Sequence, residues 1–260
     1  MRSEKRFAAM VAIIRTWNNK FISKQVQNLL SMGVGKIIVV CNATPDEGAT
    51  KGFLGNILTD PRVQLIEMFK GYSWCNALNR ALMAVQMANI KKRQSGEAEF
   101  RFVFNVSVEA GFSKNHLEHM LDAMSDDPQI GAVGTSFKGR QDSNVISLGR
   151  SYKHPRNTGM LIRLEAFVFG GFDARCDDIG GMEDIDFCLR MLTLSNLKIV
   201  MLKLDVPLVV GVNYHQPTKE AKEREAMDNI IAYWRSLFNE STPERARVDE
   251  TIAMMDIEED

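Results

Sequence analysis

The first half of the chain alternates short apolar runs with amphipathic helical patterns, and this alternation constrains the fold more than any other feature. The apolar runs have strand length and contain many β-branched residues; they cover 7–14, 36–41, 63–68, 100–106 and 130–135. Between them, apolar residues recur at helical spacing. Strands that alternate with helices form parallel sheets with right-handed crossovers. The chain is therefore predicted to be an α/β protein, with a Rossmann-like, mostly parallel sheet and helices on both faces.

The second half shows the same two element types in a less regular order. Residues 138–156 are polar and basic and predict a loop or hairpin. Strands are expected at 157–164, 198–204 and 208–214, and helices at 183–194 and 220–238. Neither an internal repeat nor a linker rich in glycine, proline and serine interrupts the sequence. We therefore expect one domain over 1–217, with a helix and an acidic tail over 218–260 that pack on it or trail from it.

Composition excludes several classes of partner. The formal net charge is -1 and the charges are mixed in sign, so no global field favours nucleic acid or an anionic membrane. The N-terminal apolar run ends at Arg15 without a cleavage site, and no run is long enough to span a bilayer. The four cysteines lack metal-binding spacing and are expected to be reduced thiols in the core. These features predict a cytoplasmic protein and leave its oligomeric state open.

The segment with the most specific chemistry begins with GGFD at 170–173 and continues with GGMEDIDFCLR at 180–190. It places Glu183 and Asp184 in the first turn of a predicted helix, directly after a flexible Gly-Gly pair. Helix N-termini stabilise carboxylate anions, and an ionised carboxylate is what proton abstraction from a hydroxyl requires. The simpler interpretation is ordinary helix capping, with Asp186 and Arg190 as an i,i+4 ion pair.

This segment resembles the acceptor-side signature of inverting family 2 glycosyltransferases, which have the glycosyltransferase-A fold. The resemblance continues at 11–18, 36–46, 71–79 and 101–117, and covers about 7–216. It implies transfer from a nucleoside diphosphate-sugar to a glycan or other hydroxyl acceptor. Asp184 would be the general base and Glu183 would hold the acceptor. The donor-binding positions that it implies are Thr16, Trp17, Asn42, Asn79, Asn105 and Ser107.

The chain departs from this family where the family carries its metal-binding D-x-D motif. Asn105 and Ser107 replace the two acids, although Mg²⁺ and Mn²⁺ prefer anionic oxygens. One account is a metal-independent enzyme in which basic residues of the 138–156 stretch neutralise the diphosphate. In a second account, Glu109 and His215 bind a divalent cation weakly. In the third, donor activation is lost and the protein is a non-catalytic binding or scaffold protein. The basic residues concerned are Lys138, Arg140, Lys153, His154 and Arg156.

Overall fold

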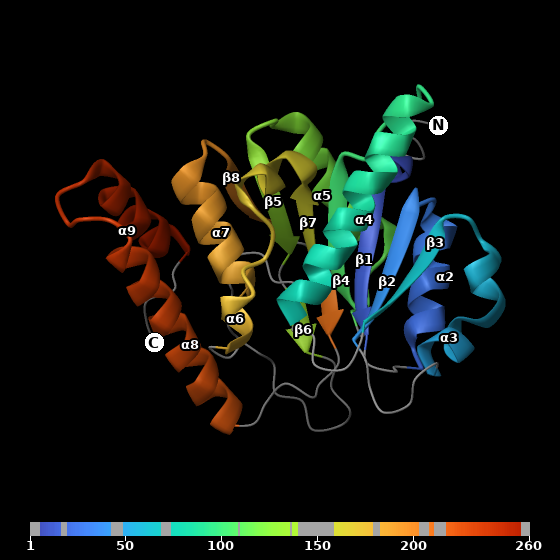
Figure 1. The fold of residues 1–260 in the computed structure, drawn as a ribbon, viewed down its shortest axis with the longest axis horizontal. Coiled ribbons are helices and arrows are strands. Elements are labelled where there is room, and N and C mark those ends of the chain that lie inside the picture. Colours follow the sequence, from blue (N-terminus) through green and yellow to red (C-terminus); the bar gives the residue numbers. More distant parts are fainter. Residues whose placement is uncertain are drawn as a thin grey trace.

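The computed structural model describes residues 6–16, 20–42, 49–68, 74–108, 110–135, 137–139, 159–178, 183–202, 208–210 and 217–255. Its centre is a seven-stranded sheet in the order β3-β2-β1-β4-β7-β5-β8 (Figure 1). The strands are β1 (Met10–Thr16), β2 (Lys36–Asn42), β3 (Val63–Met68), β4 (Phe102–Ser107), β5 (Ile130–Thr135), β7 (Gly159–Arg163) and β8 (Lys198–Leu202). Two short strands, β6 (Phe137–Gly139) and β9 (Leu208–Val210), pair in parallel beside it. The predicted α/β class with a mostly parallel sheet is confirmed.

One strand runs against the others. β7 is antiparallel to both of its neighbours, β4 and β5, whereas the remaining pairs of the large sheet are parallel. The sequence predicted a strand here but not its direction or its place between β4 and β5. Because β7 is reversed, its first residue, Gly159, pairs with Val106 near the carboxyl end of β4.

Helices cover both faces of the sheet, as predicted (Figure 1). They are α2 (Ile22–Met32), α3 (Ala49–Leu54), α4 (Trp74–Gln94), α5 (Lys114–Asp126), α6 (Arg175–Asp178), α7 (Glu183–Leu194), α8 (Pro217–Ser236) and α9 (Pro243–Met255), with short 3₁₀ turns at Gly55–Thr59 and Leu164–Phe169. Successive residues of β1 point to opposite faces. Val11 and Ile13 join the core beneath α4 and α7, whereas Ala12 and Ile14 join the core beneath α2 and α5.

Both ends of the described chain differ in detail from the prediction. The first strand begins at Met10, not at Phe7, because Phe7 lies in a helical turn and its carbonyl accepts a hydrogen bond from the N–H of Gly35. The C-terminal helix is followed by a second one, α9, that the sequence did not predict. Trp234 of α8 and Val248 of α9 are buried in the core beneath α4 and α7, so both helices pack on the domain. The acidic residues 256–260 lie outside the described part.

No helix in the described ranges combines the length and the apolar character needed to cross a membrane. The four cysteines are all buried, as predicted for core residues. Burial raises the pKa of the Cys188 thiol well above its usual value, and the nearby carboxylates of Asp184 and Asp186 raise it further.

Candidate functional site

The carboxyl ends of the central strands bring several predicted site residues to one edge of the sheet. Arg15 of β1 is the register partner of Ser107 of β4, and Thr16 is the partner of Cys41 of β2. Asn42 is the last residue of β2. Ligands of parallel α/β sheets bind beyond these carboxyl ends. The strand order places β2, β1 and β4 next to one another. The predicted donor-binding residues at their carboxyl ends therefore lie at the same edge of the sheet.

Successive side chains of a strand point to opposite faces of the sheet, so these residues do not all lie on the same face. Arg15 follows Ile13 toward the α4 and α7 side of the sheet, together with its neighbours on β4, Asn105 and Ser107. Thr16 follows Ile14 toward the α2 and α5 side and is 1% exposed. The structure thus places Thr16 on the opposite face of the sheet from Asn105 and Ser107.

Arg15 connects the end of β1 with the beginnings of two helices. Its Nη1 lies 3.2 Å from Oε1 of Glu183, the first residue of α7. Its guanidinium carbon lies 3.6 Å from the ring centroid of Trp74, the first residue of α4. Arg15 and Glu183 are both buried, with 8% and 7% exposure. The ion pair fixes the first turn of α7 at the carboxyl edge of the sheet, beside the β4 residues.

Sequence reasoning missed Arg15 as a site residue, although a signal was present. In the sequence, Arg15 is marked only as the residue at which the first apolar run ends. A permanently charged side chain that directly follows a run of apolar residues, at the end of a strand where ligands bind, is a candidate on physical grounds. Its partner could not be inferred, because Glu183 is 168 positions away in the sequence.

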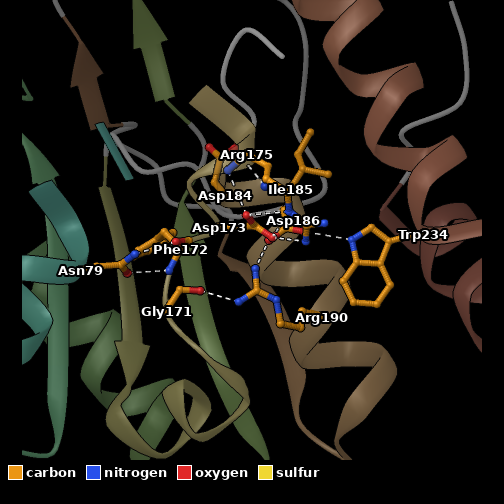
Figure 2. A network of polar contacts seen from close by, with 10 residues as sticks. All are labelled: Asn79, Gly171, Phe172, Asp173, Arg175, Asp184, Ile185, Asp186, Arg190 and Trp234. Atoms are coloured by element: carbon orange, nitrogen blue, oxygen red, sulfur yellow. Dashed lines mark hydrogen bonds and ion pairs between the residues drawn. The ribbon is translucent and has the colours of Figure 1, made fainter. Parts of the chain in front are cut away.

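A second carboxylate of the first turn of α7 has a structural role. Oδ1 of Asp186 accepts a hydrogen bond of 3.0 Å from Nε1 of Trp234 on α8, and Oδ2 forms an ion pair with Arg190. Arg190 also donates to the carbonyl of Gly171 (Figure 2). The i,i+4 pair that belongs to the simpler, helix-capping interpretation is therefore present. It joins α7 to α8 and to the loop between Gly170 and Asp173.

Asp184 is placed differently from the two carboxylates on either side. An α-helix turns by about 100° per residue, so Asp184 does not share the direction of Glu183 or Asp186. Its Oδ1 accepts a hydrogen bond of 3.0 Å from the N–H of Ile185, a contact within its own helix start (Figure 2). The side chain is largely buried, with 5% of the residue exposed.

Asn79 was predicted to bind the donor, but its side chain holds the protein's own backbone. Its Oδ1 accepts from the N–H of Phe172 at 2.8 Å, and its Nδ2 donates to the carbonyl of the same residue at 2.7 Å (Figure 2). Both ends of the amide are thus used to clamp the GGFD loop against α4. The structure gives Asn79 a positioning role in this loop.

The clamp requires a glycine at 171, and this predicts a destabilised variant. A Cβ on Gly171 would lie 2.2 Å from Oδ1 of Asn79, so Gly171→Ala forces the amide away from Phe172. We expect the free energy of unfolding to fall by about 1–3 kcal/mol, as measured by urea denaturation. Gly52→Ala in α3 is the matched control, because a Cβ there meets nothing within 4 Å. It should raise stability by about 0.5–1 kcal/mol. Equal effects of the two substitutions would contradict the clamp.

The β4 positions do not fit a divalent cation. Asn105 is neutral and 1% exposed, and Ser107 is half-buried. The carbonyl of Ser107 accepts from Nε2 of Gln25 at 3.1 Å, and Gln25 also donates to the carbonyl of Ala110 at 3.0 Å. Within the described ranges, no three histidine, cysteine or acidic side chains converge as metal ligands. Arg15 is the register partner of Ser107 on the adjacent strand, so this end of the sheet already carries a positively charged side chain.

Several predicted candidates lie outside the described residues. These are Trp17, Glu109, His215 and the basic residues Arg140, Lys153, His154 and Arg156. Lys138 belongs to β6, which pairs with β9. The described part of the site therefore consists of the carboxyl edge of the sheet, the Arg15–Glu183 pair, Asp184 and the clamped loop.

Comparison with known proteins supports the fold. No family model matches the chain, and no curated protein matches it. A solved structure described as that of a mycobacterial protein superposes with a TM-score of 0.57. The superposition covers 89% of this chain and 77% of that one, at 10% sequence identity. At this identity the likeness concerns the fold alone.

Proposed function

We propose that the protein is an inverting glycosyltransferase that moves a sugar from a nucleoside diphosphate-sugar to an acceptor hydroxyl. The observation that carries the proposal is the buried pair between Arg15 and Glu183. It holds the first turn of α7, and with it Asp184, at the carboxyl edge of the strands where α/β sheets bind nucleotides. On this proposal, the carboxylate of Asp184 acts as the base in the same site in which the carboxyl edge of the sheet binds the nucleotide.

In this reaction the acceptor oxygen forms a bond to the anomeric carbon of the sugar. The bond from that carbon to the diphosphate oxygen breaks, and its electron pair leaves with the diphosphate. The acceptor proton passes to the carboxylate of Asp184. Glu183, adjacent in the same turn, orients the acceptor. Attack occurs opposite the leaving group, so the anomeric configuration inverts.

The donor side is assigned to the strand ends. Asn42 at the end of β2 and Trp17 just beyond β1 are proposed to bind the base. Asn105 and Ser107 of β4 are proposed to line the diphosphate region. Because the β4 residues do not fit Mg²⁺ or Mn²⁺, no step of the proposed reaction passes through a metal ion.

The proposal is tested by turnover of a panel of nucleoside diphosphate-sugars, measured as release of the nucleoside diphosphate. We expect release with at least one donor, and proton NMR of the product should show an inverted anomeric configuration. A retained configuration would refute the role of Asp184. Binding of a nucleoside diphosphate without turnover of any donor would instead support a non-catalytic binding protein. That alternative is favoured by the neutral Asn105 and Ser107 at the D-x-D position.

A further inference from the structure

The end of the sheet where the resemblance implies a metal ion also carries Arg15. Arg15 and Ser107 are register partners on adjacent parallel strands, so their side chains point to the same face of the sheet. Asn105 and Ser107 supply only neutral oxygens, which bind hard divalent cations weakly. Arg15 supplies a positive charge at this edge. This charge is permanent, because arginine stays protonated in proteins.

The guanidinium of Arg15 is held in a fixed orientation. Its carbon lies 3.6 Å from the centroid of the Trp74 ring, which is the distance of a close stacking contact. Nη1 contacts Oε1 of Glu183 at 3.2 Å. A stacked guanidinium keeps its N–H groups in one plane, in the fork that matches phosphate oxygens. The stack therefore prepares Arg15 for an anionic ligand before the ligand arrives.

The ion pair with Glu183 does not by itself explain a charge at this position. Burying two opposite charges costs desolvation energy that their attraction offsets only in part, so such pairs contribute little net stability. Nη1 of Arg15 and Oε1 of Glu183 are 3.2 Å apart, which is at the long end for a charge-assisted hydrogen bond. An anion with more oxygens than one carboxylate can compete for this guanidinium.

We propose that Arg15 binds the diphosphate of the donor and neutralises the leaving group without a divalent cation. This inference rests on the proposed function. Glu183 holds Arg15 in the absence of the donor, and the diphosphate shares the guanidinium when it binds. The starts of α4 and α7 lie at the same place, and their backbone N–H dipoles add a favourable potential for an anion.

The test is calorimetry of the full chain with UDP, GDP, ADP, CDP and dTDP, in EDTA and again with Mn²⁺. We expect at least one of them to bind in EDTA, with a Kd that Mn²⁺ changes by less than about twofold.

Arg15→Lys keeps a cation beside Glu183 but loses the planar fork and the stack, so the Kd should rise about 10-fold or more. Glu183→Gln removes the competing carboxylate and should lower the Kd about threefold or more.

A matched control and three outcomes separate this inference from the proposed function. Arg62→Lys, in a half-buried pair with Asp60 before the amino end of β3, should leave the Kd within about twofold of wild type. Binding that appears only with Mn²⁺ would overturn the inference and leave glycosyl transfer standing. Metal-free binding that Arg15→Lys does not weaken would overturn the role of Arg15 alone. Binding of none of these nucleotides would overturn both.

Discussion

Asp184→Asn is expected to lower kcat for sugar transfer by about 100- to 10,000-fold, the range that a general base contributes. The amide cannot take up the proton of the acceptor hydroxyl. It keeps the oxygen that accepts a hydrogen bond from the N–H of Ile185, so the start of α7 should remain intact. Initial rates of nucleoside diphosphate release give kcat, and calorimetry with the same nucleotide gives the donor Kd, which should stay within about twofold of wild type.

The control for this variant is another carboxylate-to-amide change far from the sheet edge. Asp122→Asn on α5 alters an exposed pair with Arg6 and should keep the wild-type kcat. Wild-type turnover by Asp184→Asn would remove Asp184 from the mechanism. If Asp184→Asn loses donor binding and also loses helical signal in circular dichroism, Asp184 supports the fold.

Asp186→Ala is expected to lower the free energy of unfolding by about 3–5 kcal/mol, because it leaves a largely buried charge without its partner. Arg190 has a side chain that is 14% exposed, and it loses the carboxylate with which it pairs. Trp234 on α8 loses the acceptor of its indole N–H. The contacts of α7 with α8 and with the GGFD loop should therefore weaken together. Urea denaturation followed by tryptophan fluorescence measures the change.

Two further variants make this expectation specific. Trp234→Phe removes the indole donor but keeps the pair of Asp186 with Arg190, and we expect it to cost about 1–3 kcal/mol. Asp122→Ala removes an ion pair whose side chains are 43% and 52% exposed, and we expect it to cost less than about 1 kcal/mol. If Asp186→Ala costs no more than Asp122→Ala, the buried network does not contribute to stability in solution.

The sequence alone determined those features that depend on neighbours along the chain. Apolar periodicity predicted the seven strands of the large sheet and most helices, since a buried strand and an amphipathic helix each carry their own spacing. The short strand β6 was not predicted, because most of its residues fall at the start of a stretch that was expected to be a loop or hairpin. The start of α7 at Glu183 was also predicted, and the pair of Asp186 with Arg190 followed from the simpler, helix-capping interpretation of the same segment. Both follow from local rules, because residues four apart on a helix always face each other.

The tertiary structure alone decided which distant segments become neighbours. It placed β7 in reverse between β4 and β5, paired Arg15 with Glu183 and turned Asn79 toward Phe172. It also added α9, whose weak apolar pattern becomes informative only where Val248 meets the core. The free energy of these contacts comes from burial and pairing between residues far apart in the chain. The spacing of these residues in the sequence therefore does not reveal which distant residue each of them contacts.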